Sequence, residues 1–152
     1  MEIFTKSAAE TKEAGKRFAN DLIKSEKTHL TAALIGDLGS GKTTFVQGFA
    51  ECLGINQRIL SPTFILMRKY LVTNFPDRFK GLYHVDFYRI PENPHEEARN
   101  LGLFELWGQV GNIVLIEWGE KVKDLLPLDS YLVEFKHQGQ GIRNIAVNTL
   151  KR

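Results

Sequence analysis

The stretch from residue 36 to residue 43 has the residue types and the spacing of a phosphate-binding loop. It reads Gly-Asp-Leu-Gly-Ser-Gly-Lys-Thr and fits the pattern G-x-x-x-x-G-K-[ST]. Glycines let the backbone curl so that successive N–H groups face an anion. Lys42 would neutralise the β- and γ-phosphates, and the Thr43 hydroxyl would ligate Mg²⁺. The motif therefore predicts binding of a nucleoside triphosphate with Mg²⁺.

Carboxylates follow two of the predicted strands, at the point where each strand ends. Asp86 comes after residues 82–85, and Glu117 comes after residues 113–116. Ligands of open α/β sheets collect at the carboxyl ends of the strands, so both acids are expected to reach the region of Thr43. Either acid alone could be a solvated charge at a strand end. A phosphate-binding loop in the same domain favours the functional interpretation.

Three further features near these strands have both a structural and a functional interpretation. The Ser-Pro-Thr segment at 61–63 could sense the γ-phosphate and Mg²⁺, or could be a turn that enters a strand. His84 shares a strand face with Asp86, where a histidine is more often a hydrogen-bonded core residue than a catalytic base. Trp118 could pack half-buried or could lie near the nucleotide or a partner.

The elements around the loop place it between a strand and a helix. Residues 30–35 form an apolar run typical of a buried strand, and Phe45 and Phe49 recur at helical spacing in the helix expected from Thr44 to Leu53. The other expected elements are a helix from 8 to about 23, strands at 65–72, 82–86, 113–116, 131–136 and 142–148, a hairpin loop at 74–80 and a short helix near 96–98. This order predicts an α/β fold, a three-layer P-loop NTPase-like sheet with parallel and antiparallel strands flanked by helices.

Composition limits the class of protein. The chain of 152 residues and 17.3 kDa is expected to form a single domain over residues 1–152. Its net charge of +2 is too small to indicate a nucleic-acid partner by itself, and no DNA partner is expected. Its longest apolar runs are four residues, against the ~20 that a membrane span needs, so no membrane association is expected. The lone Cys52 cannot form an internal disulfide, which suits a cytoplasmic protein.

Five segments follow one another in a specific order. They lie at residues 36–45, 61–64, 83–89 (Tyr-His-Val-Asp-Phe-Tyr-Arg), 101–103 (Leu-Gly-Leu) and 116–118 (Ile-Glu-Trp). The ordered set closely resembles the TsaE (YjeE) family, bacterial ATPases needed to make threonylcarbamoyladenosine in tRNA. The resemblance spans roughly residues 5–148.

The resemblance implies which residues hold ATP and Mg²⁺. Those around the phosphates would be Asp37, Leu38, Gly39, Ser40, Gly41, Lys42, Thr43 and Thr44. The implied Mg²⁺ ligands are Thr43, Asp86 and Glu117. Ser40 stands where alanine is common in the family, and its backbone would do the binding.

The resemblance also implies catalytic and base-binding residues. The catalytic set would be Lys42, Thr63 and Asp86, with Asp86 as the acid that orients water or metal. Trp118 would be a mobile neighbour of the nucleotide. The walls of the base pocket would come from Ala8, Thr11 and Gly139.

Proteins of this family are expected to act with partners. The TsaD and TsaB proteins would carry the threonylcarbamoyl transfer onto the adenosine beside the anticodon. The ATPase would dock on that pair, and hydrolysis would reset the complex, so tRNA would be involved only indirectly. The sequence shows no obvious arginine finger, so hydrolysis by the isolated chain is expected to be slow.

Three other functions are compatible with parts of the sequence. A small-molecule kinase would share the loop but usually needs an arginine-rich lid, and the arginines here are scattered along the chain. A GTP-dependent switch would carry Asp-x-x-Gly and Asn-Lys-x-Asp, and neither pattern occurs. A non-enzymatic binding module clamped by a nucleotide would not need Asp86 and Glu117, although their presence does not exclude it.

Overall fold

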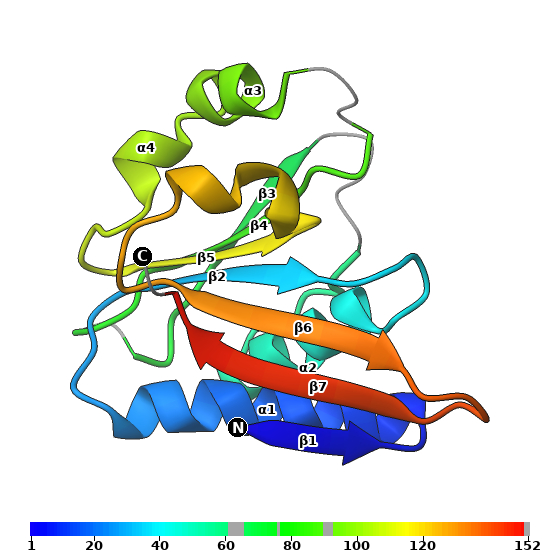
Figure 1. Cartoon of the computed structure of the whole chain (residues 1–152). Helices are drawn as coiled ribbons and strands as arrows, with labels where there is room; N and C mark the ends of the chain where they lie inside the picture. The colour runs from blue at the N-terminus through cyan, green and yellow to red at the C-terminus, as the bar shows by residue number, and fades with distance from the viewer. Residues whose placement is uncertain (61–65, 76, 90–92, 151–152) are drawn as a thin grey trace.

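The centre of the molecule is a seven-stranded sheet, seen in a computed structural model that describes residues 1–60, 66–75, 77–89 and 93–150 (Figure 1). Its strands are β1 (Glu2–Thr5), β2 (Leu30–Ile35), β3 (Met67–Leu71), β4 (Gly81–Asp86), β5 (Asn112–Glu117), β6 (Tyr131–His137) and β7 (Arg143–Thr149). The strand order is β1-β7-β6-β2-β5-β4-β3. The four central strands β6, β2, β5 and β4 run parallel, and β3, β7 and β1 pair antiparallel at the two edges. The predicted mixed α/β sheet is confirmed.

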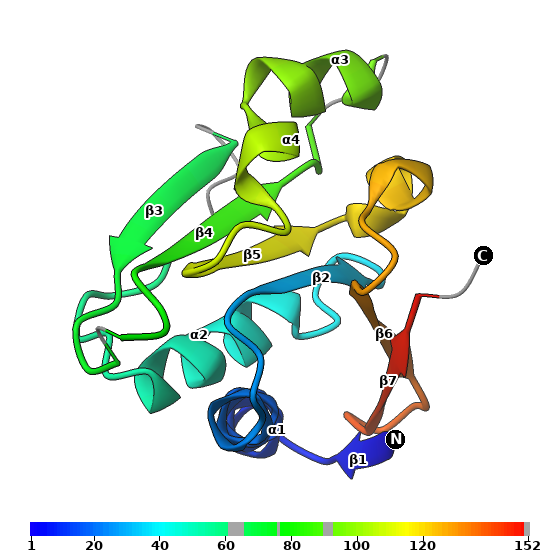
Figure 2. The ribbon, with the colours of Figure 1, turned by 90° about the vertical axis from the view of Figure 1, so that its left-hand side faces the viewer.

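Helices cover both faces of the sheet (Figure 2). One face carries α1 (Ala8–Lys24) and α2 (Lys42–Cys52), and the other carries α3 (Pro94–Asn100), α4 (Leu103–Leu106) and the 3₁₀ helix η1 (Gly119–Leu125). Side chains alternate along β2: Ala32 and Leu34 pack with the α1–α2 layer, and Ala33 packs with the other layer. A central strand buried on both faces therefore needs a continuous apolar run, which residues 32–35 supply.

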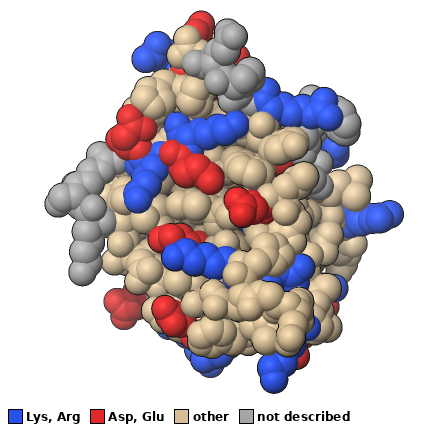
Figure 3. Space-filling model, turned by 45° about the vertical axis from the view of Figure 1, so that its right-hand side comes forward, with Lys and Arg blue, Asp and Glu red and all other residues tan. Residues whose placement is uncertain are grey.

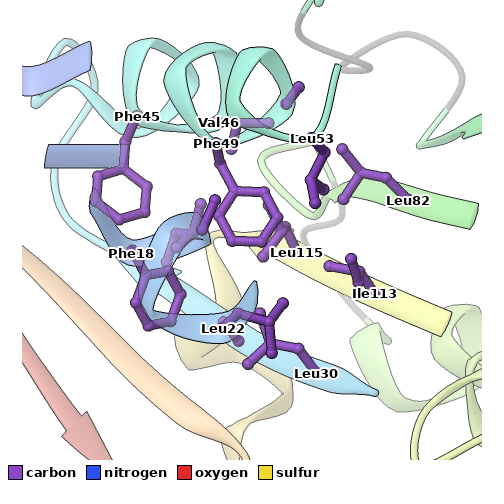
Figure 4. Packing of buried hydrophobic residues seen from close by; sticks show 14 of the residues in the cluster. Phe18, Leu22, Leu30, Phe45, Val46, Phe49, Leu53, Leu82, Ile113 and Leu115 are labelled. Carbon is purple, nitrogen blue, oxygen red and sulfur yellow. The ribbon is translucent and has the colours of Figure 1, made fainter. Parts of the chain in front are cut away.

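The layer of α1 and α2 is built on aromatic packing (Figure 4) and on two glycines. The Phe18 ring lies 5.9 Å from the Phe45 ring and 5.8 Å from the Phe49 ring, centroid to centroid. A Cβ added at Gly15 would come within 2.0 Å of the Phe45 carbonyl oxygen, and one at Gly48 within 1.9 Å of the Lys12 carbonyl oxygen. The two helix backbones are therefore in direct contact, a closeness that only glycine permits.

Both ends of α1 are held by side chains. At its start, the Ser7 hydroxyl accepts from the Glu10 amide at 3.1 Å, and Glu10 accepts in turn from the Lys6 amide at 3.1 Å. This reciprocal pair of bonds resembles a capping box. At its end, the Arg78 guanidinium donates to backbone carbonyls of Leu22, Ile23, Ser25 and Lys27. Residues 74–75 and 77–80 lie in the predicted hairpin loop between β3 and β4, and Arg78 ties this part of the chain to the end of α1.

Four elements differ from the expectation, and two of them are the short helices α4 and η1, which were not expected. β1 was not expected. Only one of its four residues is buried, so its sequence carries little of the alternating hydrophobic pattern that predicts a strand. It exists because it pairs with β7 from Glu2 to Thr5. α2 begins at Lys42 rather than Thr44, so the lysine and threonine of the motif lie in its first turn. Within the described residues, no helix combines the length and the apolar character needed to cross a bilayer.

Candidate nucleotide-binding site

The glycine loop, residues 36–41, joins the end of β2 to the start of α2. It lies at the edge of the sheet toward which the arrowheads of β2, β5 and β6 point (Figure 1). Because β2, β5 and β4 are parallel and in register, Leu34 lies beside Glu117, and Glu117 lies beside Asp86. The predicted gathering of both carboxylates at this edge is therefore present.

Glycine is required at specific points of the loop. Gly41 has φ of 103°, in the left-handed region that a side chain disfavours. A Cβ on Gly36 would lie 2.8 Å from the Phe135 carbonyl oxygen, so the loop passes close to β6. Ser40 is buried, and its hydroxyl has no hydrogen-bond partner among the described residues. Its side chain thus adds no visible bond, in keeping with a role for its backbone.

The ammonium group of Lys42 is buried, and its contacts are two backbone carbonyls and an aromatic ring rather than a carboxylate. Its Nζ donates to the carbonyl oxygens of Gly36 and Asp37, the latter at 3.0 Å, and lies 4.1 Å from the centre of the Trp118 ring. Burial lowers the pKa of Lys42, and the attraction of Glu117 partly offsets this effect. A cation in this setting would be better stabilised by a phosphate than by carbonyl dipoles and a ring.

Thr43, Glu117 and His84 form a chain of hydrogen bonds. The Thr43 hydroxyl donates to both carboxylate oxygens of Glu117, at 2.9 and 3.0 Å. The His84 Nε2 atom lies 2.6 Å from Oε2 of the same carboxylate. Glu117 is only 3% exposed. A buried carboxylate is retained when it is hydrogen-bonded, as here, or coordinates a metal.

Asp86 completes the acidic side of the site. It is 2% exposed, and its Oδ1 accepts from the Tyr88 amide at 2.8 Å. A hydroxyl and carboxylates are the oxygen ligands that Mg²⁺ prefers, usually one or two carboxylates together with phosphate oxygens and waters. The described part of the chain holds no cluster of three or more His, Cys, Asp or Glu side chains suited to a metal. The Thr43 hydroxyl and the two carboxylates are a donor set that could hold Mg²⁺ together with phosphate oxygens and waters.

These side chains line one cavity of about 400 Å³. Its lining residues are Leu38, Gly39, Ser40, Gly41, Lys42, Thr43, Thr44, Asp86, Tyr88, Glu117, Trp118 and Arg143. The structure therefore brings the loop residues, both acids and Trp118 together. Asp37 adjoins them, and its backbone carbonyl accepts from Lys42.

The remaining expected site residues lie elsewhere or outside the described ranges. Thr63 falls in the segment 61–65, which is outside the described residues. Thr11 is fully buried, with its hydroxyl 2.9 Å from that of Thr5, and it packs behind Gly41 rather than lining the cavity. Ala8 and Gly139 are exposed and do not line this cavity.

Arg143 is a site residue that sequence analysis missed. Its guanidinium donates to the Gly39 carbonyl at 3.4 Å and lines the cavity beside the loop. The parallel pairing of β6 with β2 brings the end of β6 to the loop, and β7 starts there because it runs antiparallel to β6. The signal in the sequence was a basic residue at the second position of the strand expected at 142–148.

Comparisons with known proteins agree on one family. The family model described as threonylcarbamoyl adenosine biosynthesis protein TsaE matches residues 5–145. Two proteins named tRNA threonylcarbamoyladenosine biosynthesis protein TsaE are similar to the chain. That of Bacillus subtilis is 39% identical over 112 residues, which cover 74% of this chain and 65% of the relative, slightly under two thirds of its length. That of Rickettsia felis is 37% identical over 140 residues, covering 90% and 77%. A crystal structure of Bacillus subtilis YdiB superposes with a TM-score of 0.76 at 30% identity, covering 99% of this chain and 86% of that one.

Proposed function

Because this chain belongs to the TsaE family of tRNA threonylcarbamoyladenosine biosynthesis proteins, we propose that it hydrolyses ATP to ADP and phosphate in that pathway. The proposed cofactor is Mg²⁺, and the proposed place of action is the cytoplasm. Hydrolysis would reset a complex of the TsaD and TsaB proteins between turnovers, and tRNA would be involved only through that complex.

One observation carries the proposal. Thr43 and Glu117 are in direct hydrogen-bond contact at the start of α2, beside the buried ammonium of Lys42. A hydroxyl, a carboxylate and an ammonium around a glycine loop are the groups that phosphoryl transfer from a nucleoside triphosphate requires. Burying these charges without a ligand is unfavourable. The arrangement therefore favours a role in nucleotide chemistry over a role in packing.

The residues of the cavity would divide the work. Backbone N–H groups of the glycine loop would bind the phosphates at the positive end of α2. Lys42 would move its ammonium from the carbonyls of Gly36 and Asp37 to the β- and γ-phosphates. Mg²⁺ bound at Thr43 and Glu117 would neutralise charge on the same phosphates. Asp86, at the next strand end, would orient the attacking water, with Thr63 proposed as a further catalytic group.

The base and the remaining phosphate charge need partners as well. The exposed Ala8 and Gly139 stay the proposed walls of the adenine pocket, with Trp118 beside the nucleotide. Thr11, which is fully buried behind Gly41, would support the loop there rather than contact the base. Arg143 adds a positive charge at the loop. It is available to bind phosphate oxygens from the side of the cavity opposite the carboxylates.

The mouth of the cavity supports docking of a protein partner. Leu38 is 70% exposed and Tyr88 is 42% exposed, and both line the cavity. Exposed apolar side chains beside a catalytic site suit a protein that completes the site. On the face shown in Figure 3, acidic and basic side chains are interspersed.

Mg²⁺-dependent ATP hydrolysis tests the proposal, measured with the protein alone and with purified TsaB and TsaD. We expect slow turnover alone and strong stimulation by the partners. Lys42→Ala should lose nucleotide affinity and turnover. Asp86→Ala should bind ATP but lose turnover, since a binding module would not need that acid.

The same assay distinguishes the alternatives. ATP binding without hydrolysis or stimulation would contradict the proposal and favour a small-molecule kinase or a nucleotide-clamped binding module. A screen of phosphate acceptors would then separate those two. Unchanged nucleotide affinity in Lys42→Ala would refute nucleotide binding at the glycine loop altogether.

A further inference from the structure

We infer that His84 is a positioning residue, which holds the Glu117 carboxylate in the orientation needed to ligate Mg²⁺. This inference rests on the proposed function, because it concerns the metal ligand of the same site. It gives a role to a buried histidine that the proposed chemistry does not otherwise use.

The geometry places His84 directly behind the proposed ligand. His84 is on β4 and Glu117 is on the adjacent parallel strand β5, and both face the layer of α2. In the register of the two strands, His84 lies beside Leu115, and Glu117 lies two residues further toward the carboxyl end of the sheet. The ring of His84 therefore reaches toward that end to contact the carboxylate. The resulting contact of 2.6 Å, at 0% exposure of the histidine, is short enough for a charge-assisted hydrogen bond.

The surroundings of His84 determine which nitrogen carries the proton. A hydrogen bond to a carboxylate requires the proton on Nε2. The other nitrogen, Nδ1, is buried and has no partner among the described residues. The opposite tautomer would direct a lone pair at the carboxylate and would also bury an unpaired N–H group. His84 is therefore a donor to Oε2 of Glu117.

This donor matters most when the proposed ligands bind a metal. Thr43 now donates to both oxygens of Glu117. If the Thr43 hydroxyl ligated Mg²⁺, its hydrogen would no longer bond both carboxylate oxygens of Glu117. His84 would then hold Oε2 in place, and Oε1 would be left to ligate the metal. Hydrogen bonds to ligating carboxylates fix their orientation and typically change metal affinity by about 10–100-fold.

A matched pair of amides tests this inference. In His84→Gln the amide nitrogen reaches about as far as Nε2, and in His84→Asn it reaches only about as far as Nδ1. Both variants stay polar and smaller than histidine. For each, we would titrate Mg²⁺ into protein with a non-hydrolysable ATP analogue and record the concentration for half-maximal tightening. Affinity for the analogue without Mg²⁺ is measured in EDTA.

We expect His84→Asn to need about 10–100-fold more Mg²⁺, with its affinity in EDTA unchanged within about twofold. His84→Gln should stay near the wild-type midpoint. A purely structural role of His84 would lower the melting temperature of both variants and move both affinities together. Thermal melts of the two variants and Glu117→Gln, which removes a proposed ligand directly, complete the set.

The outcomes separate the inference from the proposed function. A wild-type Mg²⁺ midpoint in folded His84→Asn, or equal defects in the Asn and Gln variants, would overturn the positioning role while the nucleotide site stands. Should His84→Asn not fold, a Gln variant with a shifted midpoint would overturn it as well. A wild-type protein that ignores Mg²⁺, with Glu117→Gln indistinguishable from it, would overturn the proposed metal site and the inference together.

Discussion

At the scale of single residues, the site contains charged side chains whose burial costs folding free energy. Lys42, Asp86 and Glu117 are each at most 5% exposed. The ammonium of Lys42 is solvated only by carbonyl oxygens and the ring of Trp118. Such groups are retained for what they bind, and their desolvation is what makes them strong partners of a phosphate.

Nucleotide affinity should fall as pH rises through the lowered pKa of Lys42. Burial lowers this pKa, and the charged form is the one that binds phosphate, so binding weakens once the free protein holds a neutral amine. The loss should start at a lower pH than for an ordinary lysine. Calorimetry with ADP between about pH 7 and about pH 10 measures it. Lys42→Ala should bind weakly at every pH, and a flat wild-type profile would contradict the assignment.

The sequence predicts the residues of the site as far as motif and strand direction determine them. Lys42 and Thr43 follow from the loop pattern, and Asp86 and Glu117 from the rule that parallel strands share a carboxyl edge. Arg143 did not follow, because its place depends on β6 pairing parallel to β2, which no local pattern encodes. That Thr11 lies behind the loop depends on how α1 packs, which is likewise a tertiary property.

At the scale of elements, α1 determines where α2 lies. Gly15 and Gly48 allow the backbones of the two helices to touch. Since α2 carries Lys42 and Thr43 in its first turn, the crossing also fixes these groups relative to the acids on β4 and β5. The hydrophobic periodicity predicted that both helices exist. Two isolated glycines in the sequence did not indicate that the backbones of the two helices touch where they cross.

Gly48→Ala should destabilise the protein. The new Cβ would overlap the Lys12 carbonyl, so the helices must separate, which costs about 1–3 kcal/mol in the free energy of unfolding. Urea unfolding measures this loss. Asn20→Ala on the exposed face of α1 is the matched control and should stay within about 0.5 kcal/mol of the wild type. A stabilising effect at position 48 would show that the crossing is looser than described.

Arg78→Met should loosen the end of α1. The guanidinium donates to the carbonyls of Leu22, Ile23, Ser25 and Lys27, and Met would leave part-buried acceptors unpaired. We expect a loss of about 2–3 kcal/mol in the free energy of unfolding.

Amide hydrogen exchange in the last turn of α1 should also become faster in Arg78→Met, which identifies the lost bonds of Arg78 as the cause. Arg17→Met on the exposed surface of the same helix is the control and should leave both measurements unchanged. Equal stability of the two variants would show that the guanidinium bonds add nothing to the fold.

At the scale of the whole molecule, one sheet serves both core layers and the site. The site takes residues from the loop after β2, the start of α2, the ends of β4 and β5 and the start of β7. Opening of any of these strands would disturb the site, so the chain is expected to unfold as one cooperative unit. This is also what its length of 152 residues predicts.

Thermal or urea unfolding should therefore show one transition. Far-UV circular dichroism reports the helices, and fluorescence reports Trp107 near α4 and Trp118 beside the cavity, so the two signals should have the same midpoint. A non-hydrolysable ATP analogue with Mg²⁺, at about 100 times its dissociation constant, should add about 2.7 kcal/mol to the free energy of unfolding. Separate midpoints for the two signals would indicate independent units instead.

The pairing of β2 has a consequence for how the protein is made on the ribosome. Both neighbours of β2 come late in translation: Ala32 pairs with Leu115 on β5 and with Tyr131 on β6. The apolar strand that leads into the glycine loop must leave the ribosome long before either neighbour exists. Native pairing of the central strand can begin only when most of the chain has been synthesised, and until then β2 offers an exposed apolar edge to other nascent chains or to chaperones.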